Sequence, residues 1–321
     1  MSLNFVVSNQ TNPYWNVAVE NYLVSLPDEG VVYMYLWKNR RTVVIGQNQN
    51  PYSECKVEAL LADGGYVMRR TTGGGAVYHD DGNINFSFVA PYGLYDQNRQ
   101  FEVIRRAVQS YGLDAELSGR NDLLCQGRKF SGNAFSKGRQ QRLHHGTILI
   151  KGNMDDLSHY LKVNPAKLHK HGVASVQSRV VNLSELADVS SDNIVPHLMA
   201  AFEEVYGEKA HKVDFSEIIE RQEVKSLYER FSSEEWLYGK WRNFTATVTG
   251  QFDWGGVELH LDVDQSNGII REVSIATDSL NVGICDTVKS LLAGASSTQP
   301  PVVPEDMADR EALNDILTLV Y

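Results

Sequence analysis

The sequence has few cysteines and no long apolar run. Its 321 residues include three cysteines, Cys55, Cys125 and Cys285, which lie far apart and outside any CxxC motif. We therefore expect neither a disulfide framework nor a zinc site, and a reducing cytoplasmic setting. No stretch approaches the ~18 apolar residues of a transmembrane helix. The N-terminus lacks a basic segment followed by an apolar run, so no signal peptide is expected.

Positive charge is also scarce. The chain has 30 Lys and Arg residues against 40 Asp and Glu residues, and its formal net charge is −10. General binding to nucleic acid or to membrane surfaces needs a basic field, so neither partner is expected. Hydrophobic residues make up 42% and charged residues 22%, which is typical of a globular protein. The length predicts two domains, or one large domain with an appendage.

Several common catalytic motifs are missing. The sequence has no GxSxG nucleophile motif, and its glycine-rich segment matches neither GxGxxG nor GxxxxGK[ST]. A serine nucleophile, a Rossmann fold and a P-loop are therefore not indicated.

Periodicity and turn residues predict a mixed order of helices and strands up to about residue 240. A helix is expected after the N-cap signal Asn12-Pro13. The other expected helices are Cys55–Ala62, Phe101–Tyr111, Asp155–Leu161, Asp192–Tyr206 and Ser216–Arg230. The expected strands are Val31–Trp37, Arg41–Ile45, Tyr66–Arg69, Asn83–Val89, Asp122–Cys125, Lys129–Phe135 and Leu143–Ile150.

The pattern changes after residue 240, where three strands precede two helices. The expected strands are Asn243–Val248, Val257–Val263 and Ile269–Ala276, and the expected helices are Asp286–Leu292 and Pro304–Leu319. We predict a small second domain of this composition, with the boundary near residues 231–238. The predicted domains are therefore residues 1–238 and 239–321.

Three consecutive glycines, Gly73, Gly74 and Gly75, follow a predicted strand and the two arginines Arg69 and Arg70. Such a run costs backbone entropy, so its freedom must serve a purpose. Taken alone, the segment is equally compatible with a tight turn and with a backbone cradle for a phosphate or carboxylate.

A basic segment stands out from the acidic chain. Between residues 120 and 142 lie six basic residues and a single acid, Asp122; the basic residues are Arg120, Arg128, Lys129, Lys137, Arg139 and Arg142. A solvated hairpin is the ordinary interpretation of such a run. Lys129, however, lies between Gly127 and Gly132 beside Phe130. A lysine in that position could stabilise a developing negative charge.

Two adjacent histidines, His144 and His145, fall on a predicted strand. Neighbouring residues on a strand point to opposite faces, so the two cannot readily share one metal ion. At most one faces a pocket, and a hydrogen-bonded structural histidine is the alternative. The segment Lys167–Leu183 could close over a ligand, and a simple surface loop fits equally well.

In their order along the chain, several segments resemble the lipoate–protein ligase A family of the biotin/lipoate ligase superfamily. These segments are Asn16–Glu20, Val43–Pro51, Arg69–Asp80, Ser118–Asp122, Arg128–Ala134, His144–Leu149 and Ser178–Leu183. Trp254–His260 resembles the accessory domain of the two-domain ligases. The resemblance favours ligand binding for the glycine run. It implies an α+β fold with a mixed, mainly antiparallel sheet, flanking helices and a small C-terminal α+β accessory domain.

The resemblance also implies a reaction. Lipoate and Mg-ATP would form lipoyl-AMP and pyrophosphate, and a lysine of an acceptor lipoyl domain would then take the lipoyl group. The implied acceptors are lipoyl domains of 2-oxoacid dehydrogenase complexes or the glycine-cleavage H protein. Such an enzyme needs no nucleophile of its own, which agrees with the missing motifs.

Residue roles follow from the same resemblance. Lys129 would bridge the lipoyl carbonyl oxygen and the α-phosphate, Asp122 would orient Lys129 or hold Mg²⁺, and Arg70 would hold phosphate. The nucleotide would be framed by Gly75, Ala76, Val77 and Tyr78, with Asn83 near the base. The lipoate tunnel would be shaped by Gly73 and Gly74, with His145 along it. Residues 167–175 would form a loop ordered by the adenylate.

Two other functions remain open. An acyltransferase on the same scaffold would move octanoyl or lipoyl groups between carrier proteins, and Cys125 would then carry the acyl group. A non-catalytic binding module would hold lipoate or an adenylate. For a ligase, the basic residues Lys137, Arg139 and Arg142 could steer an acidic acceptor domain to the active site.

Overall fold

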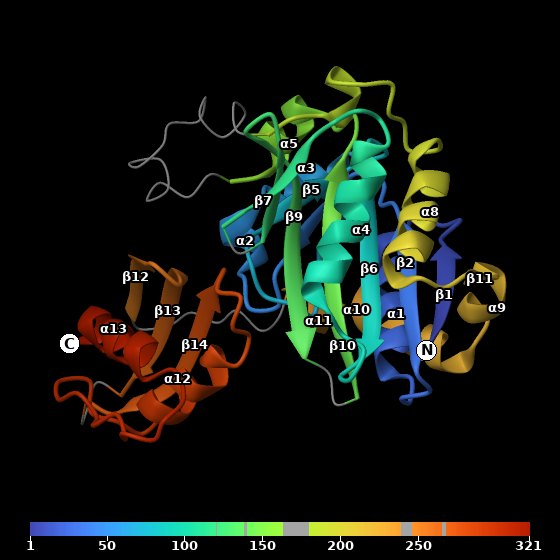
Figure 1. Cartoon of the computed structure of the whole chain (residues 1–321). Helices are drawn as coiled ribbons and strands as arrows, with labels where there is room; N and C mark the ends of the chain where they lie inside the picture. The colour runs from blue at the N-terminus through green and yellow to red at the C-terminus, as the bar shows by residue number, and fades with distance from the viewer. Residues whose placement is uncertain (120, 138–139, 163–179, 239–245, 265–267) are drawn as a thin grey trace.

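The computed structural model describes residues 1–119, 121–137, 140–162, 180–238, 246–264 and 268–321. Residues 163–179 lie outside the described residues, and so do all but the last four residues of the predicted ligand segment Lys167–Leu183. Figure 1 shows a large sheet with helices on both faces and, beside it, a separate small unit formed by the C-terminal residues.

The large sheet has eight strands in the order β11-β1-β2-β6-β10-β9-β8-β7. β1 pairs in parallel with β2 and β11, and the other pairs are antiparallel. In chain order the strands are β1 Ser2–Val7, β2 Val31–Trp37, β6 Asn83–Pro91, β7 Ala115–Ser118, β8 Asp122–Cys125, β9 Arg128–Lys137, β10 Gln141–Leu149 and β11 Ala210–Val213. The predicted mixed, mainly antiparallel sheet is confirmed.

A second sheet of three short strands carries the glycine run. Its strands are β3 Thr42–Ile45, β4 Tyr66–Arg69 and β5 Val77–His79. The central strand β3 pairs in parallel with β4 and antiparallel with β5. The chain between β4 and β5 therefore crosses the end of β3, and this crossing segment contains the three glycines.

Helices cover both faces of the large sheet. Figure 1 shows α4 and α8 on the face turned to the viewer, with α1 and α10 behind the sheet. Two apolar clusters lie between the helices and the sheet, one on each face. The helices are α1 Pro13–Ser25, α2 Pro51–Glu54, α3 Val57–Ala62, α4 Gln97–Gln109, α5 Met154–Tyr160, α8 Ile194–Tyr206, α9 Phe215–Ile219, α10 Gln222–Ser232 and α11 Glu234–Tyr238.

The C-terminal residues form their own sheet and their own apolar cluster. The elements are β12 Ala246–Phe252, β13 Gly255–Val263, β14 Ile270–Thr277, α12 Ile284–Leu292 and α13 Arg310–Val320. The expected order of three strands and two helices is confirmed. The expected start of the last helix at Pro304 is wrong, because Asp309 has a left-handed φ of 63°, which an α-helix interior does not accommodate.

Some local predictions near the helices and sheet edges were also wrong. The expected helix Ser216–Arg230 is split into α9 and α10, because Arg221 has an extended ψ of 140°. The strands β1, β5, β7 and β11 were not predicted. β5, β7 and β11 are edge strands of three or four residues, too short for a clear pattern, and β1 pairs with β11 from the far part of the chain. Within the described residues, no helix combines the length and the apolarity that crossing a membrane would need.

Candidate active site

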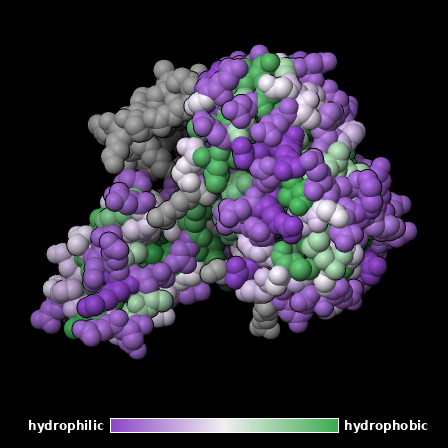
Figure 2. Space-filling model, viewed as in Figure 1, coloured by the Kyte–Doolittle hydropathy of each residue, from purple (hydrophilic) through white to green (hydrophobic). Residues whose placement is uncertain are grey.

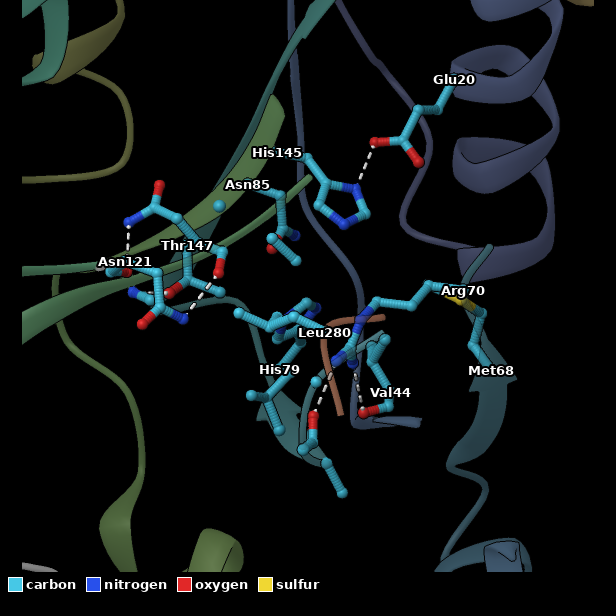
Figure 3. Close-up of a pocket in the computed structure, with 18 of the residues that line it drawn as sticks. Glu20, Val44, Met68, Arg70, His79, Asn85, Asn121, His145, Thr147 and Leu280 are labelled. Atoms are coloured by element: carbon cyan, nitrogen blue, oxygen red, sulfur yellow. Dashed lines mark hydrogen bonds and ion pairs between the residues drawn. The ribbon is translucent and has the colours of Figure 1, made fainter. Parts of the chain in front are cut away.

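A pocket of about 230 Å³ opens between the glycine run and the central strands of the large sheet. Its walls come from α1, β2 to β6, β9, β10 and the turn after β14. Figure 3 shows side chains converging on it from these elements. Trp37, Val44 and Met68 form part of an apolar wall, and the charged side chains of Glu20, Arg70 and Lys129 also line the pocket. The pocket can therefore hold a small, largely apolar ligand with a polar group.

Lys129 and Asp122 form an ion pair at one edge of this pocket. Lys129 Nζ lies 2.8 Å from Asp122 Oδ1, and the two side chains are 39% and 35% exposed. Lys129 itself lines the pocket, whereas Asp122 stands behind it. Gly132 makes room for the lysine, since a Cβ there would lie 3.0 Å from Lys129 Cε and Nζ. The predicted pair is thus brought together, with the ammonium group accessible to a ligand.

A reciprocal pair of asparagines braces this edge. Asn133 Nδ2 donates to Asn121 O at 3.0 Å, and Asn121 Nδ2 donates to Asn133 O at 2.9 Å. The chain before β8 is thereby fastened to β9. Both residues line the pocket. The side chains hold the strand that carries Lys129 in one position.

His145 links helix α1 to the glycine segment. Its Nδ1 lies 2.8 Å from Glu20 Oε1, and its Nε2 lies 2.8 Å from Thr72 Oγ1. Ser87 Oγ also donates to Glu20 Oε1, at 2.5 Å. All four residues are buried. Figure 3 shows His145 and Glu20 side by side above Arg70. A buried polar network of this kind fixes one arrangement of its members because unpaired polar groups cost free energy.

Arg70 continues this network into the glycine run. Its Nε donates to Thr72 Oγ1 at 3.1 Å, and its Nη2 donates to Gly73 O at 2.7 Å and Gly75 O at 2.9 Å. Burial lowers the pKa of Arg70 to about 10, so the guanidinium remains charged at neutral pH. In this structure Arg70 holds the shape of the glycine segment. Its predicted phosphate contact stays a prediction.

The three glycines occupy different surroundings. A Cβ on Gly73 would clash with Ser279 O and lie 2.8 Å from Leu280 Cα, so the C-terminal unit excludes any side chain there. Gly74 has a left-handed φ of 94°, which favours glycine. A Cβ on Gly75 would meet nothing within 4 Å. Gly74 and Gly75 line the pocket, and Gly73 is outside its lining.

The four other residues predicted for the nucleotide and its base divide into two groups. Ala76 and Val77 line the pocket, and Val77 is 36% exposed. Tyr78 turns away, donates to Asp156 Oδ2 at 3.1 Å, and has a pKa raised mainly by burial. Asn83 is buried and donates to Asn85 Oδ1 at 3.0 Å. Asn85, rather than Asn83, borders the pocket.

The adjacent histidines face opposite sides of β10, as predicted. His144 Nδ1 lies 3.0 Å from Gln100 Oε1 and its Nε2 lies 2.9 Å from Asn133 Oδ1. Burial lowers the pKa of His144 well below its usual value. His145 faces the pocket. In the described part of the chain, no group of three or more His, Cys, Asp or Glu side chains has the arrangement of a metal site.

All three cysteines are buried and free. Burial raises the pKa of Cys125, and it raises the pKa of Cys55 and Cys285 to about 12. None of these three described residues lines the pocket. A reactive thiolate needs a lowered pKa and access to its substrate, and the three cysteines lack both.

Several pocket residues were not singled out from the sequence. Glu20 and Val44 lie in segments that carried the family resemblance, so their positions were marked without a role. Nothing in the local pattern pointed to Trp37, Met68 or Leu280. These apolar residues belong to elements distant in sequence, and only the packing of those elements brings them to one pocket.

Comparison with known proteins agrees with this geometry. The family model for the lipoyl protein ligase A/B catalytic domain matches residues 12–203, and the model for the bacterial lipoate protein ligase C-terminus matches residues 242–302. The chain belongs to the lipoyl protein ligase A/B family. Lipoate-protein ligase A of Psychrobacter cryohalolentis is 39% identical over 91% of this chain and 88% of its own. Lipoate-protein ligase A of Bdellovibrio bacteriovorus is 36% identical over 91% of this chain and 88% of its own.

Solved structures of the family share the fold. LipL1 of P. falciparum in complex with lipoate has a TM-score of 0.82 at 28% identity, covering 99% of this chain and 98% of its own. A bipartite ligase from Thermoplasma acidophilum, studied with its E2 lipoyl domain, has a TM-score of 0.67 at 26% identity. The match covers 77% of this chain and 100% of the ligase chain. A lipoate-protein ligase A bound with ATP has a TM-score of 0.64 at 26% identity, and the match covers 74% of this chain and 99% of its own.

Proposed function

We propose that this protein is an ATP-dependent lipoate–protein ligase. Lipoate reacts with Mg-ATP to give lipoyl-AMP and pyrophosphate, and a lysine of an acceptor lipoyl domain then takes the lipoyl group and releases AMP. The observation that carries the proposal is the pocket with an apolar wall, the accessible Lys129 ammonium at one edge and the glycine run beside it. Membership of the lipoyl ligase family supports the choice of substrate.

Lys129 is the proposed catalytic residue of both steps. In the first step a lipoate oxygen forms a bond to the α-phosphorus, and the bond to pyrophosphate breaks. In the second step an amine attacks the acyl carbon, and the bond to AMP breaks. Negative charge on the phosphate and carbonyl oxygens can be stabilised by an ammonium held in place beforehand. The 2.8 Å contact with Asp122 supplies that placement.

Asp122 fits a magnesium ion that arrives with the nucleotide. Mg²⁺ bound with substrate phosphates takes one or two protein carboxylates and keeps several waters. Asp122 is a partly exposed carboxylate beside the proposed phosphate position. Asp122 would therefore hold the ion together with the phosphates, and the bound ion would offset phosphate charge.

The nucleotide would lie against the open side of the glycine run. Space beside Gly75 and the exposure of Val77 leave room for a ligand next to this backbone. Arg70 supports the same backbone from inside. We also propose base contacts from the backbone of Val77 and Tyr78, and a position near the base for Asn83. Gly73 and Gly74 would shape the tunnel that His145 borders.

The two units of the chain would have different roles. We propose a catalytic domain of residues 1–238 and an accessory domain of residues 239–321, and the boundary adjoins residues outside the described ranges. Acceptors would be lipoyl domains of 2-oxoacid dehydrogenase complexes or the glycine-cleavage H protein, modified in the cytoplasm. The P. falciparum and T. acidophilum neighbours, with lipoate and an E2 lipoyl domain respectively, support this substrate and this acceptor class.

The basic segment does not gather at one place. Lys129 and Lys137 lie near opposite ends of β9, ~26 Å apart at the rise of a strand. Arg142 on β10 lies opposite Lys137 in the strand register, and the Arg142 guanidinium lies 4.3 Å from the Tyr92 ring centroid. Arg139 is outside the described residues. Steering of an acidic acceptor to the pocket therefore falls more naturally to Arg128, beside Lys129.

An acyltransferase that carries the acyl group on a cysteine is the competing function. The buried cysteines, with pKa values raised by burial, do not favour it. Under the ligase proposal, Cys125→Ala retains activity. Loss of acyl transfer in Cys125→Ala, with correct folding shown by circular dichroism, would favour the acyltransferase.

The direct test is ATP-dependent pyrophosphate release with lipoate, measured with and without an acceptor lipoyl domain. Wild type is expected to release pyrophosphate and to modify the acceptor. Removing one preorganised charge-stabilising donor costs about 10²–10³ in rate, so Lys129→Ala should lose activity by about that factor while Lys129→Arg loses less. Release by Lys129→Ala at the wild-type rate would contradict the assigned role.

A further inference from the structure

The turn between β14 and α12 reaches from the C-terminal unit into the proposed acyl pocket. Leu280 in this turn lines the pocket, although the rest of the lining comes from the first 147 residues of the chain. Figure 3 shows Leu280 in front of the pocket, between the side occupied by Thr147 and the side occupied by Arg70. The pocket wall is therefore shared between two parts of the chain that have separate apolar clusters.

Backbone contacts hold this turn in place. Gly74 N donates to Ser279 O at 3.0 Å, and Thr277 N donates to Asn48 O at 2.9 Å. Asn48 Nδ2 in turn donates to Val282 O at 2.9 Å. The turn is thus bonded on both sides of Leu280 to segments that border the pocket. These hydrogen bonds fix the position of the Leu280 side chain at the pocket.

The glycine run is shaped to receive the turn. A Cβ at Gly73 would clash with Ser279 O and would lie 2.8 Å from Leu280 Cα. A Cβ at Gly74 would lie 3.3 Å from Leu280 Cδ2. Figure 2 shows hydrophobic residues along the hollow between the two parts of the molecule. The backbone of the glycine run therefore lies directly against the backbone of the turn, and the apolar Leu280 side chain lies next to it at the pocket.

We propose that Leu280 is a specificity-determining residue for the acyl group, supplied by the C-terminal unit. The inference rests on the proposed function, because it takes lipoate as the occupant of the pocket. Leu280 is 40% exposed in this structure, so an acyl chain in the pocket can bury more of its side chain. Burial of this apolar surface favours ligands that touch it. The shape of the side chain then affects which acyl groups fit.

The experiment compares Leu280→Ala, Leu280→Phe and wild type with lipoate and octanoate. Calorimetry measures binding of each acid without ATP, and pyrophosphate release measures KM for each acid and for ATP. Losing part of one leucine contact should raise the Kd and KM for lipoate by about three- to tenfold, with the KM for ATP unchanged. Leu280→Phe should change the ratio of lipoate to octanoate affinity, because the wall is altered in shape and kept apolar.

Val302→Ala is the matched control. Val302 is 87% exposed in the same C-terminal unit and does not line the pocket. All constants should stay within about twofold of wild type for this variant, because a surface substitution away from the site changes little. Equal constants for wild type and both Leu280 variants would overturn the proposal. So would equal proportional losses for lipoate and octanoate in Leu280→Phe, which would indicate a general loss of pocket structure.

Gly73→Ala tests whether Leu280 acts through the docked turn. Its Cβ should displace the turn and raise the lipoate Kd about as much as Leu280→Ala does. The double variant should then bind lipoate no more weakly than either single variant, since the two changes remove the same contact. Additive losses would overturn the proposed route. Failure of wild type to release pyrophosphate would contradict the ligase function instead, and the calorimetric ratios would still decide the role of Leu280.

Discussion

The two units of the chain differ in what they bury. The large unit buries charged and polar side chains around its pocket, among them Glu20, Arg70 and His79. In the described part of the C-terminal unit, the buried polar side chains are Thr277 and Ser279, both at the turn that reaches the pocket. Burying polar groups costs free energy unless they are hydrogen-bonded. The large unit therefore keeps hydrogen-bonded polar groups in its interior, at the pocket and elsewhere, whereas the described core of the C-terminal unit is almost wholly apolar.

Two neighbouring arginines show how this polarity is used. Arg69 donates to the carbonyl oxygens of Gln49 at 2.6 Å, Trp236 at 2.8 Å and Leu237 at 2.7 Å. Burial lowers the pKa of Arg69 to about 10. Arg70 holds the glycine run in the same manner. Arg69 thus fastens the last helix before the C-terminal unit, while Arg70 shapes the pocket.

The largest effect on stability should come from Glu20→Ala. The substitution leaves Ser87 and His145 without their shared acceptor in a buried site, which should lower the free energy of unfolding by about 3 kcal/mol. Glu20→Gln keeps an acceptor oxygen and should lose less than half as much. Urea denaturation measures both. Equal stability of wild type and Glu20→Ala would break the contrast between the two units.

Acid should destabilise the large unit next. Burial lowers the pKa of His79 to about 3, so between pH 6.5 and pH 3 the unfolded chain takes up a proton that the folded chain does not. Stability is therefore full above pH 6.5 and falls as the pH decreases, by about 2 kcal/mol at pH 5 for this histidine. The buried His144, whose pKa is also lowered, adds a loss in the same direction.

Hydrogen exchange of the full chain at pH 7 and pH 5 can locate this acid effect. Amides of β3 to β5, which carry His79, and of β10, which carries His144, should lose protection, after correction for the intrinsic pH dependence of exchange, while amides of β12 to β14 change less. His79→Gln should remove part of the pH dependence. Equal loss of protection in the sheets of both units would show that the buried histidines do not distinguish the two units.

A smaller effect is expected for Ser279→Ala in the C-terminal unit. Ser279 Oγ accepts from Asn281 N at 3.1 Å, and its loss should cost about 1 kcal/mol or less. The docking bond uses Ser279 O and remains in this variant. Urea denaturation should place Ser279→Ala well above Glu20→Ala in stability. A loss as large as that of Glu20→Ala would remove the proposed difference.

The smallest effect should be that of Arg142→Glu on acceptor modification. Arg142 lies opposite Lys137 in the strand register, at the end of β9 distant from Lys129. Its separation from Lys129 is far beyond the Debye length of ~8–10 Å at ordinary salt. The KM for an acceptor lipoyl domain should stay within about twofold, whereas Arg128→Glu should raise it and change its salt dependence. A strong effect of Arg142→Glu would restore the predicted role for the basic hairpin.

Local elements were predictable where local physics decides them. The bounds of β2, β4 and β8 match the prediction, since runs of apolar residues end at turn residues. Asn12 caps α1 by accepting from Tyr14 N at 2.9 Å, with Pro13 in the first turn. The parallel pair of β1 and the edge strand β11 was missed, because Leu3 of β1 lies opposite Ala210 of β11, far along the chain.

The candidate site was predictable only in part for the same reason. The position of Lys129 beside glycines indicated that it could stabilise negative charge. His145 was assigned to the pocket only through the resemblance to the ligase family, because its place on a strand left a structural role open. The resemblance to the ligase family supplied roles, which the geometry leaves as proposals. The phosphate contact expected for Arg70 stays a prediction, and the structure adds that its Nη2 donates to the carbonyl oxygens of Gly73 and Gly75. A side chain's hydrogen-bond partners depend on the whole fold, so its local sequence did not reveal them.

Composition and local pattern alone indicated the net charge of −10, many of the helices and strands, and the segments that place the chain in its family. These properties follow from composition, periodicity and short motifs, which are local. The contact of Gly73 with Ser279 and the place of Leu280 at the pocket became visible in the folded structure alone. Both depend on close approach between residues about 200 positions apart, and such contacts are set by the packing of whole elements.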